Sequence, residues 1–260
     1  MTGGGDAAVA GATMRAADLV IFDFDGPITR LLPDPEYLEL AAATIRLVRD
    51  AGVEVPPEIA ALTDHGAVIV EVGRRWPEVL ARVEAVSDAA EIAAAGLRDP
   101  APGAVDLLRA LAAAGTPVAL VSNNGAACVH AFMDRFGLGA WAGQSPRQRT
   151  APGTRSGGHR ATRSARGPLV SHVFGRVSGR ADRLKPSPAM LLDAAVAAGV
   201  PASAAVMVGD SVTDVEAAAA AGMPGIGLTP DADRSRAMRE AGAVAVLPDT
   251  AALGQAYAAA

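Results

Sequence analysis

The feature that most constrains the fold is an alternation of helical stretches with short apolar runs. Four times along the chain a helical stretch ends at a glycine, and a short apolar run follows it. Glycine readily adopts the left-handed backbone that closes a helix, and short apolar runs are typical of strands buried on both faces. With the apolar run at 19–23, about five strands alternate with helices, which favours a doubly wound parallel α/β sheet. The paired ranges are 107–115 with 118–122, 190–199 with 204–209, 215–222 with 225–228, and 236–242 with 243–247.

Residues 33–98 interrupt this alternation. They contain helical patterns, such as the one at 37–50, without strand runs between them. At 260 residues the chain is long enough for one core plus a small second unit. We therefore predict a helical domain at 33–98, inserted into a Rossmann-like core made of residues 18–32 and 99–260.

Two further stretches have the composition of disordered chain. Residues 1–17 are rich in glycine and alanine, so we predict a disordered N-terminal tail and regard Met14 as a plausible true start. Residues 142–169 are rich in Arg, Gly, Ser, Thr and Pro and have no hydrophobic periodicity, which predicts a disordered loop. A nucleic-acid-binding arm is the alternative for this loop, but it lacks interleaved aromatic side chains, and we favour an unstructured insertion.

Charge and composition exclude several classes of protein. No apolar run approaches the roughly 20 residues needed to cross a bilayer, so we expect no membrane partner. The net charge is −5 even with six arginines between 141 and 170, which argues against a nucleic-acid partner. The single cysteine, Cys128, allows no internal disulfide and suits a reducing cytoplasm.

Polar and charged residues follow the predicted strands at corresponding ends. Ligands of doubly wound sheets bind beyond the carboxyl ends of the strands, so these residues are expected to converge. Any one of them alone has an ordinary explanation, such as a helix N-cap or a turn, but their conjunction predicts a site. The set comprises Asp23 and Asp25 after the first strand, Ser122 and Asn123 after the second, Asp210 and Asp214 after a later one, and Lys185.

The charges in this set indicate the chemistry. Two like charges about 4 Å apart repel by about 4 kcal/mol at an effective dielectric constant of 20, so clustered aspartates require a counter-charge. Lys185 supplies one, and it is the only lysine among the 23 Lys and Arg residues. Carboxylates without a His or Cys cluster point to Mg²⁺ rather than Zn²⁺. A metal also allows an aspartate to attack phosphorus.

These residues resemble the motifs of the haloacid dehalogenase (HAD) superfamily, in particular its phosphoglycolate phosphatase-like members with a helical cap. The motifs read DFDGPIT from Asp23, VSNNG around Ser122, RLKPSP around Lys185 and VGDSVTD around Asp210. The resemblance covers about residues 19–247 outside the 142–169 loop. It implies a Mg²⁺-dependent phosphatase that hydrolyses a small phosphorylated metabolite through an aspartyl-phosphate.

The resemblance also implies residue roles. Asp23 would be the nucleophile, and Asp25 the general acid and then the base. Ser122, Asn123 and Lys185 would bind the transferring phosphoryl group. The metal would be held by Asp23, by the backbone carbonyl of Asp25 and by Asp210, with Asp214 supporting either the metal or Lys185.

Several alternatives stay open from the sequence. Arg30 could bind a substrate anion or be a solvated hinge residue, and His65, Arg74 and Arg75 are the polar cap residues to test first. A dehalogenase or phosphonate hydrolase is disfavoured because Asp25 is present. A sugar phosphomutase, or a non-catalytic phosphoryl- or metal-binding module, would share the site. The sequence is silent on assembly, and we expect a monomer or homodimer.

Overall fold

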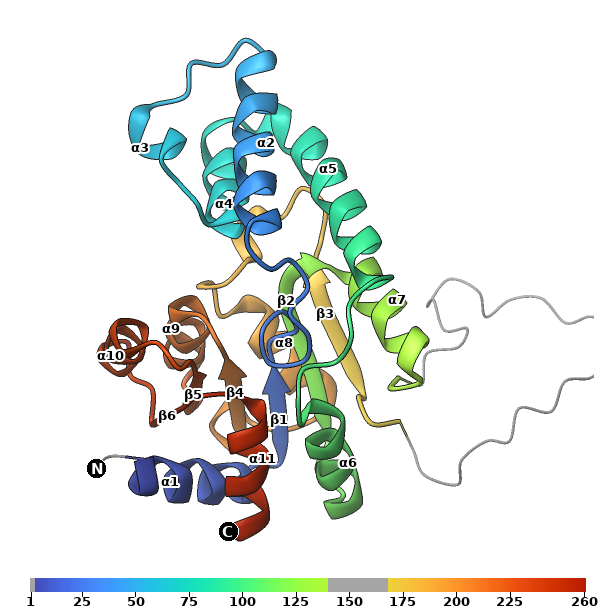
Figure 1. Ribbon diagram of the computed structural model, residues 1–260, viewed down its shortest axis with the longest axis vertical. Helices are drawn as coiled ribbons and strands as arrows, with labels where there is room; N and C mark the ends of the chain where they lie inside the picture. The colour runs from blue at the N-terminus through green and yellow to red at the C-terminus, as the bar shows by residue number, and fades with distance from the viewer. Residues whose placement is uncertain (1–2, 140–167) are drawn as a thin grey trace, which may run out of the picture.

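The structure is a computed structural model, and it describes residues 3–139 and 168–260. A six-stranded parallel sheet with the order β3-β2-β1-β4-β5-β6 forms the centre of these residues (Figure 1). This confirms the predicted α/β fold class. The strands are β1 (Leu19–Phe22), β2 (Val118–Gly125), β3 (His172–Arg176), β4 (Ala205–Gly209), β5 (Gly225–Leu228) and β6 (Ala245–Leu247).

Helices cover both faces of the sheet because its strands are apolar on both. Val20 and Phe22 of β1 pack into one layer, whereas Leu19 and Ile21 pack into the other. The first layer contains α1 (Gly3–Ala16), α6 (Ala104–Ala114), α7 (Ala126–Phe136) and α11 (Thr250–Ala259). The second contains α8 (Ala189–Ala198) and α9 (Val212–Ala221), while α10 (Ala232–Glu240) lies between β5 and β6 in the chain.

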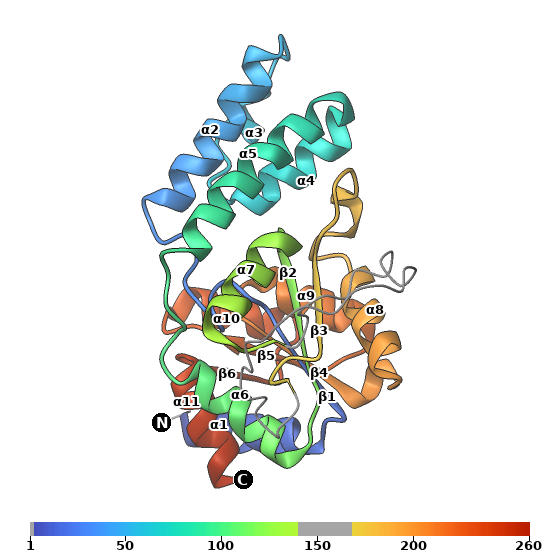
Figure 2. The same ribbon diagram turned by 90° about the vertical axis from the view of Figure 1, so that its right-hand side faces the viewer.

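The inserted helical region lies beyond the carboxyl ends of the strands (Figures 1 and 2). Its helices fall within the predicted range 33–98, and the apolar cluster that fills its interior continues into the second layer of the core. The segment after β3 reaches up to it so closely that a Cβ at Gly73 would overlap the Ala181 side chain. The helices are α2 (Glu36–Asp50), α3 (Pro57–Ala60), α4 (His65–Arg75) and α5 (Pro77–Ala95).

The prediction of a disordered tail at 1–17 is wrong for the residues that the structure describes. Residues Gly3–Ala16 form helix α1, whose Ala10 and Met14 are fully buried. The helix packs on α11, where the Arg15 Nη2 donates a hydrogen bond of 2.6 Å to the Tyr257 carbonyl. Tertiary packing of small side chains stabilises this helix although its sequence has little amphipathic pattern.

The predicted loop at 142–169 lies almost entirely outside the described residues, and so do six arginines between 141 and 170. Strand β3, which follows this stretch, was not predicted from the sequence. In the described parts of the chain, none of the helices combines the length and apolar character that crossing a membrane requires.

Candidate active site

The central strands place the predicted residues at one edge of the sheet. Strand β1 pairs with β2 on one side and with β4 on the other. The chain runs outward from β1 in both directions, so the order reverses between β1 and β4, where doubly wound sheets bind ligands. Asp23 and Asp210 directly follow β1 and β4, and Ser122 directly follows Val121, where the regular pairing of β2 with β3 stops.

Lys185 connects these strand ends. Its Nζ lies 2.8 Å from Asp23 Oδ1 and 2.6 Å from Asp214 Oδ1, and it donates a hydrogen bond of 3.2 Å to the Val121 carbonyl. Burial opposes the charge of Lys185, but the Asp214 and Asp23 carboxylates outweigh burial and raise its pKa. The ammonium group therefore stays charged at the centre of the site.

The acidic side chains around Lys185 carry more negative charge than its one positive charge can balance. Burial raises the pKa of Asp23, Lys185 lowers it, and Asp214 raises it again, with a net increase. Burial and the charges of Asp23, Asp214 and Asp25 hold the pKa of Asp210 well above its ordinary value. Each of these carboxylates thus lacks part of the positive charge that would stabilise its ionised form.

The same carboxylates form a group able to hold a metal. One oxygen from each of Asp23, Asp210 and Asp214 lies within 4.8 Å of the others. Hard divalent cations prefer such oxygen donors, and a cation would supply the missing positive charge. The donor set therefore fits a divalent cation. Asp214 has further partners, because its Oδ2 accepts a hydrogen bond of 3.0 Å from the Ser211 amide and its Oδ1 contacts Lys185.

Glycines allow these carboxylates to approach the backbone. Gly26 has φ +104°, which L side chains rarely adopt, and a Cβ there would overlap the Asp210 carboxylate. A Cβ at Gly209 would likewise overlap the Asp214 carboxylate. The glycines beside Asp25 and Asp210 are thus steric requirements of the site.

Asp25 lies in the turn that leads to the inserted helices. Its Oδ1 accepts a hydrogen bond of 2.8 Å from the Leu31 amide. Burial raises its pKa to about 6, and the negative charge of Glu91 adds to this increase, whereas the Leu31 bond and the nearby Arg30 oppose it. A carboxyl group with such a pKa can both donate and accept a proton near neutral pH. Arg30 itself is exposed, so its role stays a prediction.

The irregularly paired last part of β2 holds Ser122 and Asn123. The Ser122 hydroxyl donates to Asn124 Oδ1 at 2.9 Å, and the Asn124 amide donates back to the hydroxyl at 3.2 Å. The Asn123 side chain contacts the backbone of Lys185, accepting from its amide at 2.8 Å and donating to its carbonyl at 3.1 Å. Asn123 therefore positions the lysine, and its predicted contact with substrate stays a prediction.

The polar cap residues to be tested first have partners within the helical region. His65 is buried, with Nε2 2.9 Å from the Ser87 hydroxyl. Arg74 and Arg75 pair with Glu71 on a solvent-facing side of α4. Gly66, near the start of α4, comes close to Asn123 of the core, because a Cβ built on this glycine would lie 3.7 Å from Asn123 Nδ2.

Tyr37 and Asp64 are polar cap residues that the sequence analysis missed. The Tyr37 hydroxyl donates to Asp64 Oδ1 at 3.0 Å, and Asp64 caps the first turn of α4. Burial and the Asp64 charge raise the pKa of Tyr37, with a smaller contribution from Asp25. A tyrosine at the start of a helical pattern carries no signal that distinguishes it from a core residue.

Comparison with known proteins identifies the family. The family model described as haloacid dehalogenase-like hydrolase matches residues 17–222. The chain belongs to this family. The matched range includes Asp23, Ser122, Lys185 and Asp210. A search of the curated proteins found no match.

Solved structures of several hydrolases and predicted phosphatases share this fold. A HAD family hydrolase from Deinococcus radiodurans, with bound phosphate and sodium, is 26% identical, covering 93% of this chain and 96% of that chain with a TM-score of 0.52. A hydrolase from Pseudomonas syringae is 20% identical over 90% and 94% of the two chains, with a TM-score of 0.60. A predicted phosphoglycolate phosphatase from Haemophilus somnus is 20% identical over 91% and 96%, with a TM-score of 0.52.

Proposed function

We propose that this HAD-like hydrolase is a Mg²⁺-dependent phosphatase that hydrolyses small phosphomonoesters through a phosphorylated Asp23. The observation that carries the proposal is the contact of buried Lys185 with Asp23 inside a cluster of three carboxylates. One ammonium group and one divalent cation would together balance the charge of both the carboxylates and a bound phosphate.

In the proposed first step, an Asp23 carboxylate oxygen attacks phosphorus and the bond from phosphorus to the ester oxygen breaks. The leaving oxygen takes a proton from Asp25. In the second step, water attacks the phosphorus on Asp23 and gives a proton to Asp25, which releases inorganic phosphate and restores the Asp23 carboxylate. The pKa of Asp25, raised to about 6 by burial, suits both transfers.

Side chains of the site would hold the phosphoryl group and the cation. Lys185 and the Ser122 hydroxyl would bind phosphoryl oxygens. Asp23 and Asp210 would hold Mg²⁺ together with the Asp25 backbone carbonyl, and Asp214 would fix Lys185. The cation supplies charge neutralisation and in-line positioning of the phosphoryl group.

The substrate class is part of the proposal. The structural neighbour named a predicted phosphoglycolate phosphatase and the helical region over the site support a small phosphorylated metabolite rather than a polymer. We further propose that the enzyme acts in the cytoplasm as a monomer or homodimer, without a nucleic-acid or membrane partner.

Substitution of the nucleophile tests this function. Asp23→Asn should abolish hydrolysis of p-nitrophenyl phosphate in the presence of Mg²⁺, because an amide cannot form the acyl phosphate intermediate. The exposed Asp182→Asn variant is the matched control and should retain full activity. EDTA should stop the parent enzyme and Mg²⁺ restore it. Turnover by Asp23→Asn at the rate of the parent would refute the nucleophile, and turnover in EDTA would refute the metal requirement.

A further inference from the structure

Residues 122–124 lack regular sheet partners in the described structure. Strands β2 and β3 pair in register as far as Val121 with Phe174, and the register then shifts until Gly125 pairs with Arg176. The intervening residues 122–124, called the Ser122 loop below although they lie within β2, include Ser122. The proposed function assigns the Ser122 hydroxyl to the phosphoryl group. Its backbone conformation must therefore be stabilised by something other than the strand ladder.

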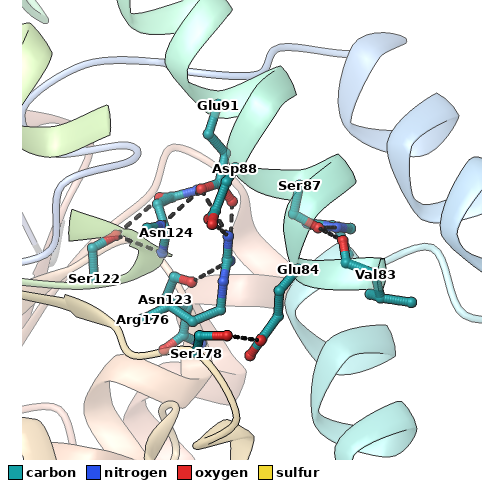
Figure 3. A network of polar contacts seen from close by, with 12 residues as sticks. Val83, Glu84, Ser87, Asp88, Glu91, Ser122, Asn123, Asn124, Arg176 and Ser178 are labelled. Atoms are coloured by element: carbon teal, nitrogen blue, oxygen red, sulfur yellow. Dashed lines mark hydrogen bonds and ion pairs between the residues drawn. The ribbon is translucent and has the colours of Figure 1, made fainter. Parts of the chain in front are cut away.

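Arg176 and Glu91 provide that stabilisation (Figure 3). Arg176 Nη1 donates a hydrogen bond of 2.8 Å to the Asn123 carbonyl, and Glu91 Oε2 accepts one of 2.7 Å from the Gly125 amide. The two side chains thus hold the backbone on either side of Asn124. They also bind each other, with Arg176 nitrogens 3.1 and 3.0 Å from the two Glu91 oxygens.

This pair is buried. The Arg176 side chain is 2% exposed and the Glu91 side chain 0%. Asp88, which is half-exposed, adds a contact of 2.6 Å to Arg176 Nη2. Close packing surrounds the loop as well, since a Cβ at Gly125 would clash with Asp88 and one at Gly175 with Ala126. A loop held this tightly by a buried charge pair has one preferred conformation.

We propose that Arg176 and Glu91 are positioning residues that fix the Ser122 loop in its phosphate-binding conformation. Because Glu91 belongs to α5, the inserted helical region forms part of the frame of the phosphate site. This inference rests on the proposed function for its catalytic consequence. Neither residue touches the reacting atoms.

Glu84 offers a matched control on the same helix. It lies two turns before Glu91, is buried, and also ties α5 to the core by accepting from the Ser178 hydroxyl at 2.7 Å and the Gly179 amide at 3.0 Å. Glu84 contacts the segment after β3, whereas Glu91 binds the Gly125 amide at the end of the Ser122 loop. Comparison of Glu91→Gln with Glu84→Gln therefore separates loop positioning from attachment of the helix.

The test measures kcat, KM and inhibition by inorganic phosphate with p-nitrophenyl phosphate and Mg²⁺. Glu91→Gln should lower kcat roughly 10- to 100-fold, since small misplacements of binding groups have effects of this size, and should weaken phosphate inhibition. Glu84→Gln should change each constant less than about threefold. Equal effects of the two variants, or no effect of Glu91→Gln, would overturn the inference.

A single substitution such as Arg176→Met could fail to fold, because it leaves the Glu91 charge buried without its partner. A double variant avoids this problem. Replacing a buried ion pair with apolar side chains is often neutral for stability, so Arg176→Met with Glu91→Met should melt near the parent temperature and still be slow. Recovery of the parent rate in the folded double variant would contradict the inference. If the parent hydrolyses no ester, the proposed function fails, and calorimetric binding of inorganic phosphate with Mg²⁺ then decides the inference: unchanged affinity in Glu91→Gln, or no binding by the parent, overturns it.

Discussion

Among individual residues, His65 shows how burial changes a titratable group outside the proposed metal site. The ring lies inside the helical region, bonded to Ser87 and in edge contact with Tyr37 at 6.3 Å between centroids. Burial and the positive charge of Arg176 lower its pKa to about 4, while Asp64 partly opposes them. The folded protein therefore holds a neutral imidazole at pH values where the unfolded chain is protonated.

The pH dependence of stability should reflect this histidine. The pKa of His65 in the folded protein lies below the unfolded value of about 6.5. The contribution of this residue to the free energy of unfolding is therefore complete above pH 6.5 and is lost as the pH falls from 6.5 to 4. The loss should reach about 3 kcal/mol, from about 1.4 kcal/mol per pKa unit. Urea unfolding of the parent and of His65→Gln at pH 7.5, 5.5 and 4.5 measures it.

His65→Gln is its own control because glutamine retains hydrogen-bonding atoms but does not titrate. The difference in unfolding free energy between parent and variant should shrink or reverse as the pH falls. A difference that stays constant over this range would show that the histidine is not buried in its neutral form.

For a single element, α1 shows how small residues permit packing that a hydrophobic pattern does not reveal. Gly11 faces α11 so closely that a Cβ would overlap the Ala256 carbonyl oxygen. A Cβ at Gly5, in the same helix, would have no atom within 4 Å of it. The two glycines therefore separate helix propensity from helix contact.

Alanine substitutions of these glycines should act in opposite directions. Gly5→Ala should raise the free energy of unfolding by up to about 1 kcal/mol, because alanine favours the helix. Gly11→Ala should lower it by about 1–3 kcal/mol, because overpacking forces α1 away from α11. Thermal and urea unfolding measure both. A stabilised Gly11→Ala variant would show that α1 does not pack closely on α11.

The sequence predicted elements best where one local signal was sufficient. Glycines such as Gly115 and Gly199, both with φ near +75°, end helices before buried strands, so the alternation was readable. Strand β3 was missed because HVFGR is short and its burial is only partial at His172, Val173 and Phe174. Helix α1 was missed because its partner α11 lies at the other end of the chain.

The candidate site followed from the same logic, but its supports did not. Residues at strand ends converge by topology alone, which placed Asp23, Ser122 and Asp210 together. The Arg176–Glu91 pair joins residues 85 positions apart, and no motif spacing indicates it. Asn123 was predicted as a substrate ligand. The structure shows its side chain bonded to the Lys185 backbone, a contact that the sequence does not indicate.

Over the whole molecule, the excess of carboxylates at the sheet edge should make stability depend on Mg²⁺. Binding to the folded state alone contributes about 2.7 kcal/mol at a concentration 100 times Kd. Mg²⁺ should therefore raise the melting temperature of the parent at pH 7.5, and Asp210→Asn should remove most of this increase. The exposed Asp106→Asn variant should respond like the parent. An equal shift in Asp210→Asn would exclude Asp210 as a ligand.

The contacts of Lys185 have a practical consequence. Every other basic side chain that could carry a fixed positive charge is an arginine, so amine-directed labelling has a single lysine to modify. Because its Nζ is enclosed by two carboxylates and a carbonyl, acylating reagents should reach it only when the sheet edge opens. The rate at which Lys185 is acylated would then report how often this edge of the sheet opens. Mass spectrometry can measure that rate without any introduced probe.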